Sequence, residues 1–75
     1  MIEQSFFGGP MDGDRVAWSE PKQWVVYVSG IRPVLMAHLR HTYAFMGGNY
    51  WYVGVGIRVP EYDYHEIIWL DAVAK

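Results

Sequence analysis

The sequence predicts a mainly β protein, built as one small twisted antiparallel sheet or barrel of four or five short strands. Glycine and proline, eight and four among 75 residues, divide the chain into short pieces, which favours strands over long helices. Aromatic and β-branched residues crowd the later pieces, as strands require. The length sets a single small domain, residues 1–75. A short C-terminal helix, or an α+β fold, is the alternative.

The N-terminal stretch FFGGPMDG (Phe6–Gly13) contains three glycines, a proline and an aspartate. Its spacing fits neither a P-loop, nor the dinucleotide fingerprint GxGxxG, nor a calcium loop. Turn chemistry accounts for it instead, because proline presets φ, aspartate bonds nearby backbone and glycine accepts a left-handed conformation. We expect strands at Ile2–Phe7 and Arg15–Trp18, with Phe6 or Phe7 in the core. The structural turn between them consists of Gly8, Gly9, Pro10, Asp12 and Gly13.

Trp24–Val28, WVVYV, is apolar on both faces and predicts a central strand. A hairpin follows, with arms His38–Met46 and Tyr50–Val55 around the loop Gly47–Asn49. A three-residue loop sets Met46 opposite Tyr50 and Phe45 opposite Trp51. Alternation then gives one face, the expected core, to Leu39, His41, Tyr43, Phe45, Trp51, Val53 and Val55.

The other face of this hairpin is the candidate binding surface. It carries an arginine, a methionine and two tyrosines, and tyrosine and arginine are enriched at interface hot spots. We expect partner contact through Arg40, Met46, Tyr50 and Tyr52, provided that no other part of the chain covers them.

Ile57–Val59 is expected to prolong the second hairpin arm until Pro60. Two segments keep open alternatives. Pro33–Met46 also fits a helix, although we prefer a strand for its second half, and Val34–Ala37 fits a helix or a strand. Glu61–Lys75 has early acidic residues and a late lysine, which suit a helix dipole, whereas its isoleucines and tryptophan suit a strand; a short helix is our preference.

Composition excludes several chemistries. The chain has no cysteine, so neither a disulfide nor a thiolate metal site can form. On a strand, His38 and His41 point to opposite faces, and we expect no metal site, no cofactor and no catalytic residues. A net charge of −2 argues against general nucleic-acid binding. The sequence contains no apolar run of about 20 residues and no signal-peptide pattern, so we expect no membrane association.

Two short motifs of this chain resemble a known sequence pattern. The first consists of Phe7, Gly8, Gly9, Pro10, Asp12 and Gly13, and the second of Tyr50, Tyr52 and Gly54. An aromatic residue before GGPxDG and a later YxYxG strand resemble a pattern in small uncharacterised proteins of tailed phages and prophages. The tail beyond Gly54 departs from that pattern. The resemblance implies an origin, but neither an activity nor a site.

From this origin we expect a phage-encoded, non-enzymatic interaction protein. It would bind and inhibit a host factor, such as a defence complex, in the host cytoplasm, and the small core and surplus aromatics suggest a homodimer. One alternative is a protein that sequesters a nucleotide signal, with charge from Arg32, Arg40 and Arg58 and stacking from tyrosines. Another is a minor virion or assembly component.

Overall fold

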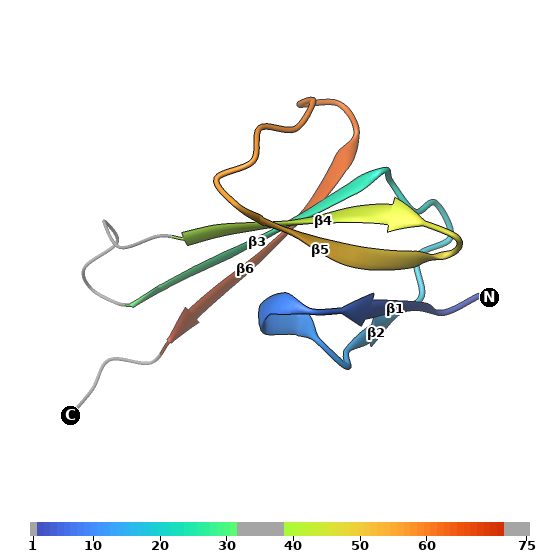
Figure 1. Ribbon diagram of the computed structural model, residues 1–75, viewed down its shortest axis with the longest axis horizontal. Coiled ribbons are helices and arrows are strands. Elements are labelled where there is room, and N and C mark those ends of the chain that lie inside the picture. The colour runs from blue at the N-terminus through green and yellow to red at the C-terminus, as the bar shows by residue number, and fades with distance from the viewer. Residues whose placement is uncertain (1, 32–38, 72–75) are drawn as a thin grey trace.

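The computed structural model describes residues 2–31 and 39–71. They form one six-stranded sheet with the order β2-β1-β5-β4-β3-β6 (Figure 1). The mainly β prediction is confirmed, with six strands in place of four or five. No helix in the described ranges is long and apolar enough to cross a membrane. The elements are β1 (Gln4–Phe7), a 3-10 turn η1 (Gly9–Met11), β2 (Arg15–Val16), β3 (Trp24–Ile31), β4 (Leu39–Met46), β5 (Asn49–Val55) and β6 (Tyr64–Asp71).

The sheet is mixed, whereas the sequence predicts an antiparallel one. β1 lies parallel to β5, and β6 lies parallel to β3. The remaining pairs, β1–β2, β3–β4 and β4–β5, are antiparallel. The difference arises because a parallel pair needs a long connection between its strands, and local sequence patterns report hairpins but not such distant pairings.

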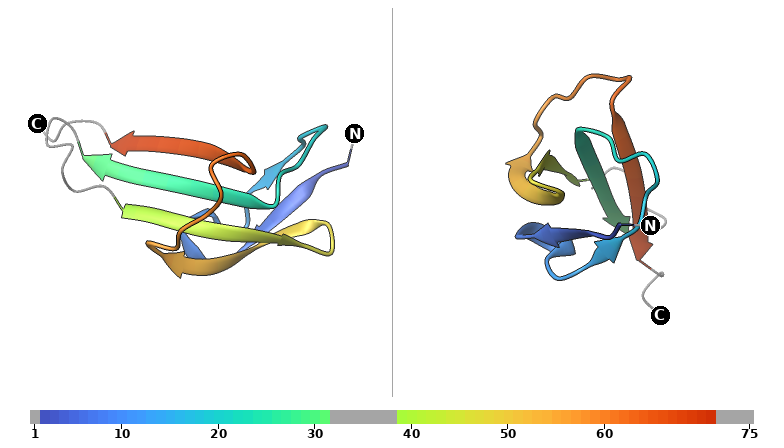
Figure 2. Two further views of the ribbon diagram at one scale, coloured as in Figure 1. Left: turned by 90° about the horizontal axis from the view of Figure 1, so that it is seen from above. Right: turned by 90° about the vertical axis from the view of Figure 1, so that its right-hand side faces the viewer.

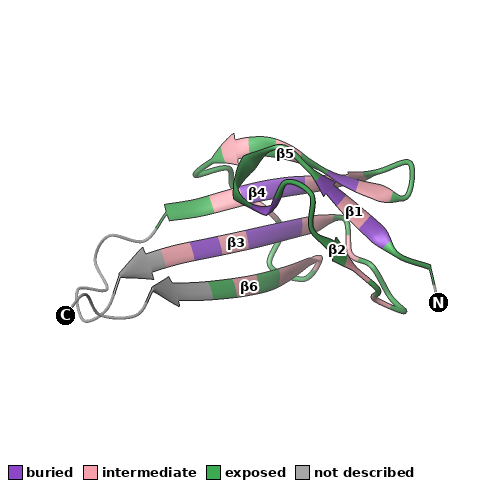
Figure 3. Cartoon of the chain, turned by 90° about the horizontal axis from the view of Figure 1, so that it is seen from below, coloured by how far each residue is buried: buried purple, intermediate pink, exposed green. Residues whose placement is uncertain are grey.

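The sheet curls into a half-barrel, and the core lies inside the curl (Figure 2). Its fully buried members are Phe6, Val25, Tyr43 and Tyr50, with Met11 almost as deep. Figure 3 shows the buried stretches on β1, β3 and β4, and no described side chain of β6 is buried. We call the side that holds this cluster the concave face and the opposite side the outer face. The expected central position of Trp24–Val28 is confirmed, because β3 lies between β4 and β6.

Residues 56–63 connect β5 to β6 and cross the outer face of β4 and β3 (Figure 1). Gly56 N–H donates to the Arg40 carbonyl at 2.9 Å, and the Thr42 hydroxyl donates to the Ile57 carbonyl at 3.4 Å. Beneath this crossover Val26 and Thr42 are buried. The expectation that Ile57–Val59 prolongs the second hairpin arm is therefore wrong. Gly56, with φ of 74°, turns the chain away from the strand direction.

The preferred C-terminal helix is also wrong, because Tyr64–Asp71 forms strand β6. It pairs with β3 without interruption, from Trp24 opposite Tyr64 to Ile31 opposite Asp71. The apolar β3 offers a partner along its whole length, and this tertiary pairing outweighs a weak charge pattern typical of helices. The final residues 72–75 lie outside the described residues, as do Arg32, His38 and the undecided segment Val34–Ala37.

The FFGGPMDG stretch reverses the chain between β1 and β2, as predicted. Gly8, Gly9 and Gly13 all have positive φ, Pro10 lies in the first turn of η1, and the Asp12 carboxylate accepts a hydrogen bond from Gly8 N–H at 2.7 Å. The loop also packs closely on the sheet. A Cβ atom on Gly9 would lie 2.5 Å from Cδ1 of Tyr52 and 2.6 Å from the hydroxyl oxygen of Tyr43, so glycine is required there for space as well as for φ.

The β4–β5 hairpin closes with a two-residue turn, Gly47–Gly48. Both glycines have positive φ, 62° and 87°, as a two-residue hairpin turn of this kind needs. Met46 therefore faces Asn49, and Phe45 faces Tyr50. The expected three-residue loop is one residue too long, and a slip of one residue exchanges the two faces of a strand. A bulge in the pairing between Thr42 and Tyr43 limits the exchange to the half of β5 nearest the turn.

Candidate protein-binding surface

The four residues predicted to form a binding surface do not share a face. Tyr50 is fully buried and Tyr52 half-buried on the concave side, whereas Arg40 and Met46 are exposed. The register slip explains the error, because it moves both tyrosines to the side of Tyr43. Replacing Tyr50 and Tyr52 by alanine would therefore remove packed side chains from the concave face, and it would not isolate a binding defect.

Tyr50 belongs to the core. Its ring stacks on Phe6 with centroids 5.1 Å apart, and its hydroxyl donates to the Lys22 carbonyl at 2.6 Å. Burial is the main cause that raises the pKa of Tyr50 to about 12, against the opposing effect of the Lys22 hydrogen bond, with a smaller contribution from the Asp63 charge. The hydrogen bond from the Tyr50 hydroxyl to Lys22 therefore fixes the segment before β3 to the sheet.

Tyr43 holds the N-terminal loop in the same way, whereas Tyr52 contacts His41. The Tyr43 hydroxyl donates to the Gly8 carbonyl at 2.7 Å and accepts from Met11 N–H at 2.8 Å. Burial raises the pKa of Tyr43. The Tyr52 hydroxyl lies 2.9 Å from Nδ1 of His41. These polar groups are satisfied within the chain, so the concave tyrosines support the structure.

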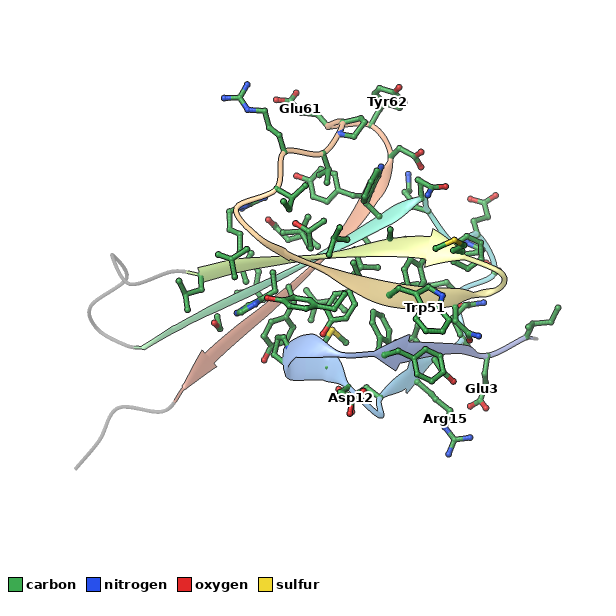
Figure 4. The ribbon with its side chains drawn as sticks, in the orientation of Figure 1. Glu3, Asp12, Arg15, Trp51, Glu61 and Tyr62 are labelled. Carbon is green, nitrogen blue, oxygen red and sulfur yellow. The ribbon has the colours of Figure 1, made fainter. Side chains whose placement is uncertain are left out.

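The outer face presents different aromatics. Phe7 and Trp51 lie opposite each other in the β1–β5 pair and stack with centroids 4.5 Å apart at 22°. They remain 40% and 42% exposed. Strand alternation places Met46 on the same face as Trp51, and Val53 lies at the bulge two residues further along β5; these two residues are 64% and 48% exposed. We call these four residues the Phe7–Trp51 patch; Figure 4 labels Trp51 beside β1 and β5.

The patch is apolar apart from one group that is already satisfied. Trp51 Nε1–H donates to the Met46 carbonyl at 3.0 Å, which fixes the indole over the hairpin turn. The crossover of residues 56–63 covers β3 and β4 and leaves this half of the outer face open. Sequence reasoning missed the patch because it placed Trp51 and Val53 in the core. The signal that could have found it is the pair Gly47–Gly48, since glycine at both central positions is typical of a two-residue turn.

Two hollows lie elsewhere. One of about 480 Å³ is mostly apolar and is lined by Ile2, Gln4, Trp18, Ser19, Pro21, Phe45 and Gly48. A second, of about 270 Å³, brings Arg40 and Arg58 together with Tyr64 and Glu61. Arg40 also pairs with Glu66 at 3.4 Å. Two carboxylates therefore balance the two guanidinium groups, and the arrangement does not favour an anionic ligand such as a nucleotide.

No metal-binding cluster of three histidine or acidic side chains occurs among residues 2–31 and 39–71. His41 is partly buried, and its Nδ1 lies 2.9 Å from the Tyr52 hydroxyl oxygen. His65 stacks on Trp18 at 4.1 Å, and its Nε2 lies 3.1 Å from the Glu20 carbonyl. Both described histidines thus have structural partners, on different parts of the sheet.

Comparisons of the chain with protein-family models, with curated proteins and with solved structures found no match. The candidate surface therefore rests on the geometry of this chain alone.

Proposed function

We propose that this chain is a non-enzymatic protein that binds another protein through the Phe7–Trp51 patch. The observation that carries the proposal is the stacked pair of large aromatic rings left about two-fifths exposed on the open half of the sheet. Burying such rings against a partner removes a large apolar area from water. Tryptophan is among the residues most enriched at binding hot spots.

The chemistry of the patch indicates the chemistry of its partner. Its four side chains carry no charge, and Glu3 and Arg15, which lie near β1 and β2, pair with each other at 3.6 Å (Figure 4). The partner surface should therefore be an apolar depression that accepts the indole and phenyl rings. Methionine adds a flexible rim that adapts to such a depression.

The resemblance to small phage proteins supports a more specific proposal, in which the partner is a host protein and binding inhibits it. The target class, for instance a defence complex, follows from origin by analogy and not from any side chain. The patch proposal does not depend on this step.

The test compares three proteins in affinity capture from bacterial lysates followed by mass spectrometry. They are the wild type, the double variant Phe7→Ala/Trp51→Ala, and Tyr62→Ala as a control. Tyr62 is an aromatic residue that is 83% exposed on the crossover, away from the patch (Figure 4). We expect the same captured protein with the wild type and the control, and its loss with the double variant.

Binding of the purified captured protein should then be measured by calorimetry. Loss of a central aromatic typically costs about 2 kcal/mol or more of binding free energy, so the double variant should bind at least tenfold more weakly. Urea unfolding of each variant shows that the fold persists. Capture that is equal for all three proteins would refute the patch as the binding surface.

A further inference from the structure

The two edges of the sheet are built differently. The β2 edge has two residues, Arg15 and Val16, and the arginine pairs with Glu3. The β6 edge has eight residues. Edge strands of native proteins are usually short, charged, bulged or covered, because their free N–H and C=O groups otherwise pair with another chain. The β2 edge is short and charged, and the β6 edge is neither short nor interrupted.

The sequence of β6, YHEIIWLD, contains no proline, glycine or lysine. Its pairing with β3 has no bulge over the eight residues. Every second residue of such a strand directs its backbone N–H and C=O away from its neighbour. Within the described parts of the chain β3 is the only strand paired with β6, so these groups lack a strand partner.

The beginning of β6 is covered and its continuation is not. Trp18 stacks on His65, and the Glu20 carbonyl lies against the same imidazole. In the next part of the strand Glu66 pairs with Arg40 at 3.4 Å, and Ile68 is 59% exposed on the outer face. Among the described side chains of β6, Ile68 therefore marks the open stretch of the edge.

We propose that β6 pairs in the antiparallel direction with β6 of a second copy of this chain. Such a pair has a two-fold axis perpendicular to the sheet, and the two concave faces then stay on the same side. Because side chains alternate, only registers that join residues of the same face are possible. The register with Ile68 opposite Ile68 satisfies this condition, and it keeps Glu66 of one copy away from Glu66 of the other.

A second copy presents a β6 edge of the same length and twist, so two half-barrels can join into one continuous sheet of twelve strands, twice the six of one chain. The new strand pair covers both Ile68 side chains at once, as an isologous interface does. A short strand pair buries less than the roughly 1,200 Å² of a standard stable interface, so the dimer should dissociate on dilution.

This interface is independent of the Phe7–Trp51 patch. β4 and β3 separate β5, which carries Trp51, from β6. Dimerisation through β6 therefore leaves the patch open in both copies and makes the assembly bivalent toward a partner.

The oligomeric state, measured by light scattering over a concentration series, tests the proposal. The wild type should approach twice the 8.7 kDa mass of one chain at high concentration. Ile68→Lys places a charge at the centre of the edge and should remain monomeric. Val53→Lys is the matched control, since it adds the same charge at a similarly exposed position of the patch, and it should dimerise like the wild type.

Hydrogen exchange of the wild type gives a second readout that needs no variant. Amides of β6 that point away from β3 should exchange more slowly as the concentration rises, while amides of β5 should not change. A wild type that stays monomeric throughout refutes the proposal. So does a dimer that survives Ile68→Lys, and loss of the dimer in Val53→Lys alone would place the contact on the patch instead.

Discussion

Two aromatic stacks lie back to back on the same pair of strands. Phe6 faces Tyr50 on the concave side, and Phe7 faces Trp51 on the outer side, one register position further along. Their geometries are similar, with interplanar angles of 16° and 22°. Their surroundings are not, because the inner pair is fully buried and the outer pair is about two-fifths exposed. Stacking alone therefore does not distinguish a structural pair from a binding pair, whereas burial does.

The polar atoms give the same contrast. Tyr50 of the inner pair belongs to a set of tyrosines whose hydroxyls each bond a backbone carbonyl or an imidazole nitrogen. The outer pair has one indole N–H, bonded to a carbonyl of its own hairpin. The hydroxyl groups of the concave tyrosines are thus satisfied within one chain, whereas the outer pair still has apolar area to bury.

The largest expected effect on the free energy of unfolding comes from a comparison of the inner and outer stacks at two adjacent residues. Phe6→Ala should lower the free energy of unfolding by about 3–5 kcal/mol, since it empties a fully buried aromatic site. Phe7→Ala should lower it by only about 1 kcal/mol, the scale of one cross-strand pair. Urea titration followed by circular dichroism measures both. Equal losses would mean that the outer stack is also structural.

A second, smaller effect tests how closely the loop packs on the concave tyrosines. Gly9→Ala combines a positive φ with a clash against Tyr52 and Tyr43, and we expect a loss of about 2–3 kcal/mol. Gly13→Ala is the control, with a positive φ but no atom within 4 Å of the added Cβ, and should lose about 1 kcal/mol. Thermal and urea unfolding give the two values. If Gly13→Ala loses as much as Gly9→Ala, the backbone conformation and not the packing controls the loop.

The smallest effect concerns the Tyr50 hydroxyl. Tyr50→Phe removes its bond to Lys22 and should cost about 1 kcal/mol at neutral pH. The pKa of Tyr50 in the folded protein, about 12, lies above the ordinary tyrosine value of 10.0, so the unfolded state loses its proton first as pH rises. Stability from this group is complete below the unfolded pKa and declines as pH rises toward the folded pKa.

The variant should therefore show a shallower loss of stability than the wild type between these two pKa values. Urea unfolding at neutral pH and at several alkaline pH values separates the hydrogen bond from the titration. Identical alkaline slopes in the two proteins would contradict the assignment of Tyr50 to the buried stack.

Local signals predicted the local parts of this fold. The Gly-Pro-Asp-Gly chemistry of the N-terminal loop, the apolar run of β3 and the glycine hairpin each depend on neighbouring residues, and the structure confirms them. The two parallel pairings join segments more than thirty residues apart. The residues near β6 in the sequence do not indicate that β3 will pair with it. Without that information, the weak charge pattern of this segment favoured a helix.

The candidate binding surface was misplaced because the predicted hairpin loop was one residue too long. Reading Gly47–Asn49 as the loop, instead of Gly47–Gly48, placed Tyr50 outside and Trp51 inside. Both residues are large, aromatic and compatible with either face, so composition could not correct the slip. Alternation transmits a one-residue error to every side chain until a bulge compensates it.

Because β1 pairs with β5, the N-terminal strand needs a partner that is made much later in the chain. When β1 leaves the ribosome its only available neighbour is the two-residue strand β2, and a ribbon of two strands is marginally stable at best. Phe6 and Phe7 must stay unpaired until Tyr50 and Trp51 are made. Because distant pairings close slowly, this aromatic dipeptide acquires its strand partners late, and the folding rate should depend on how quickly β1 finds β5.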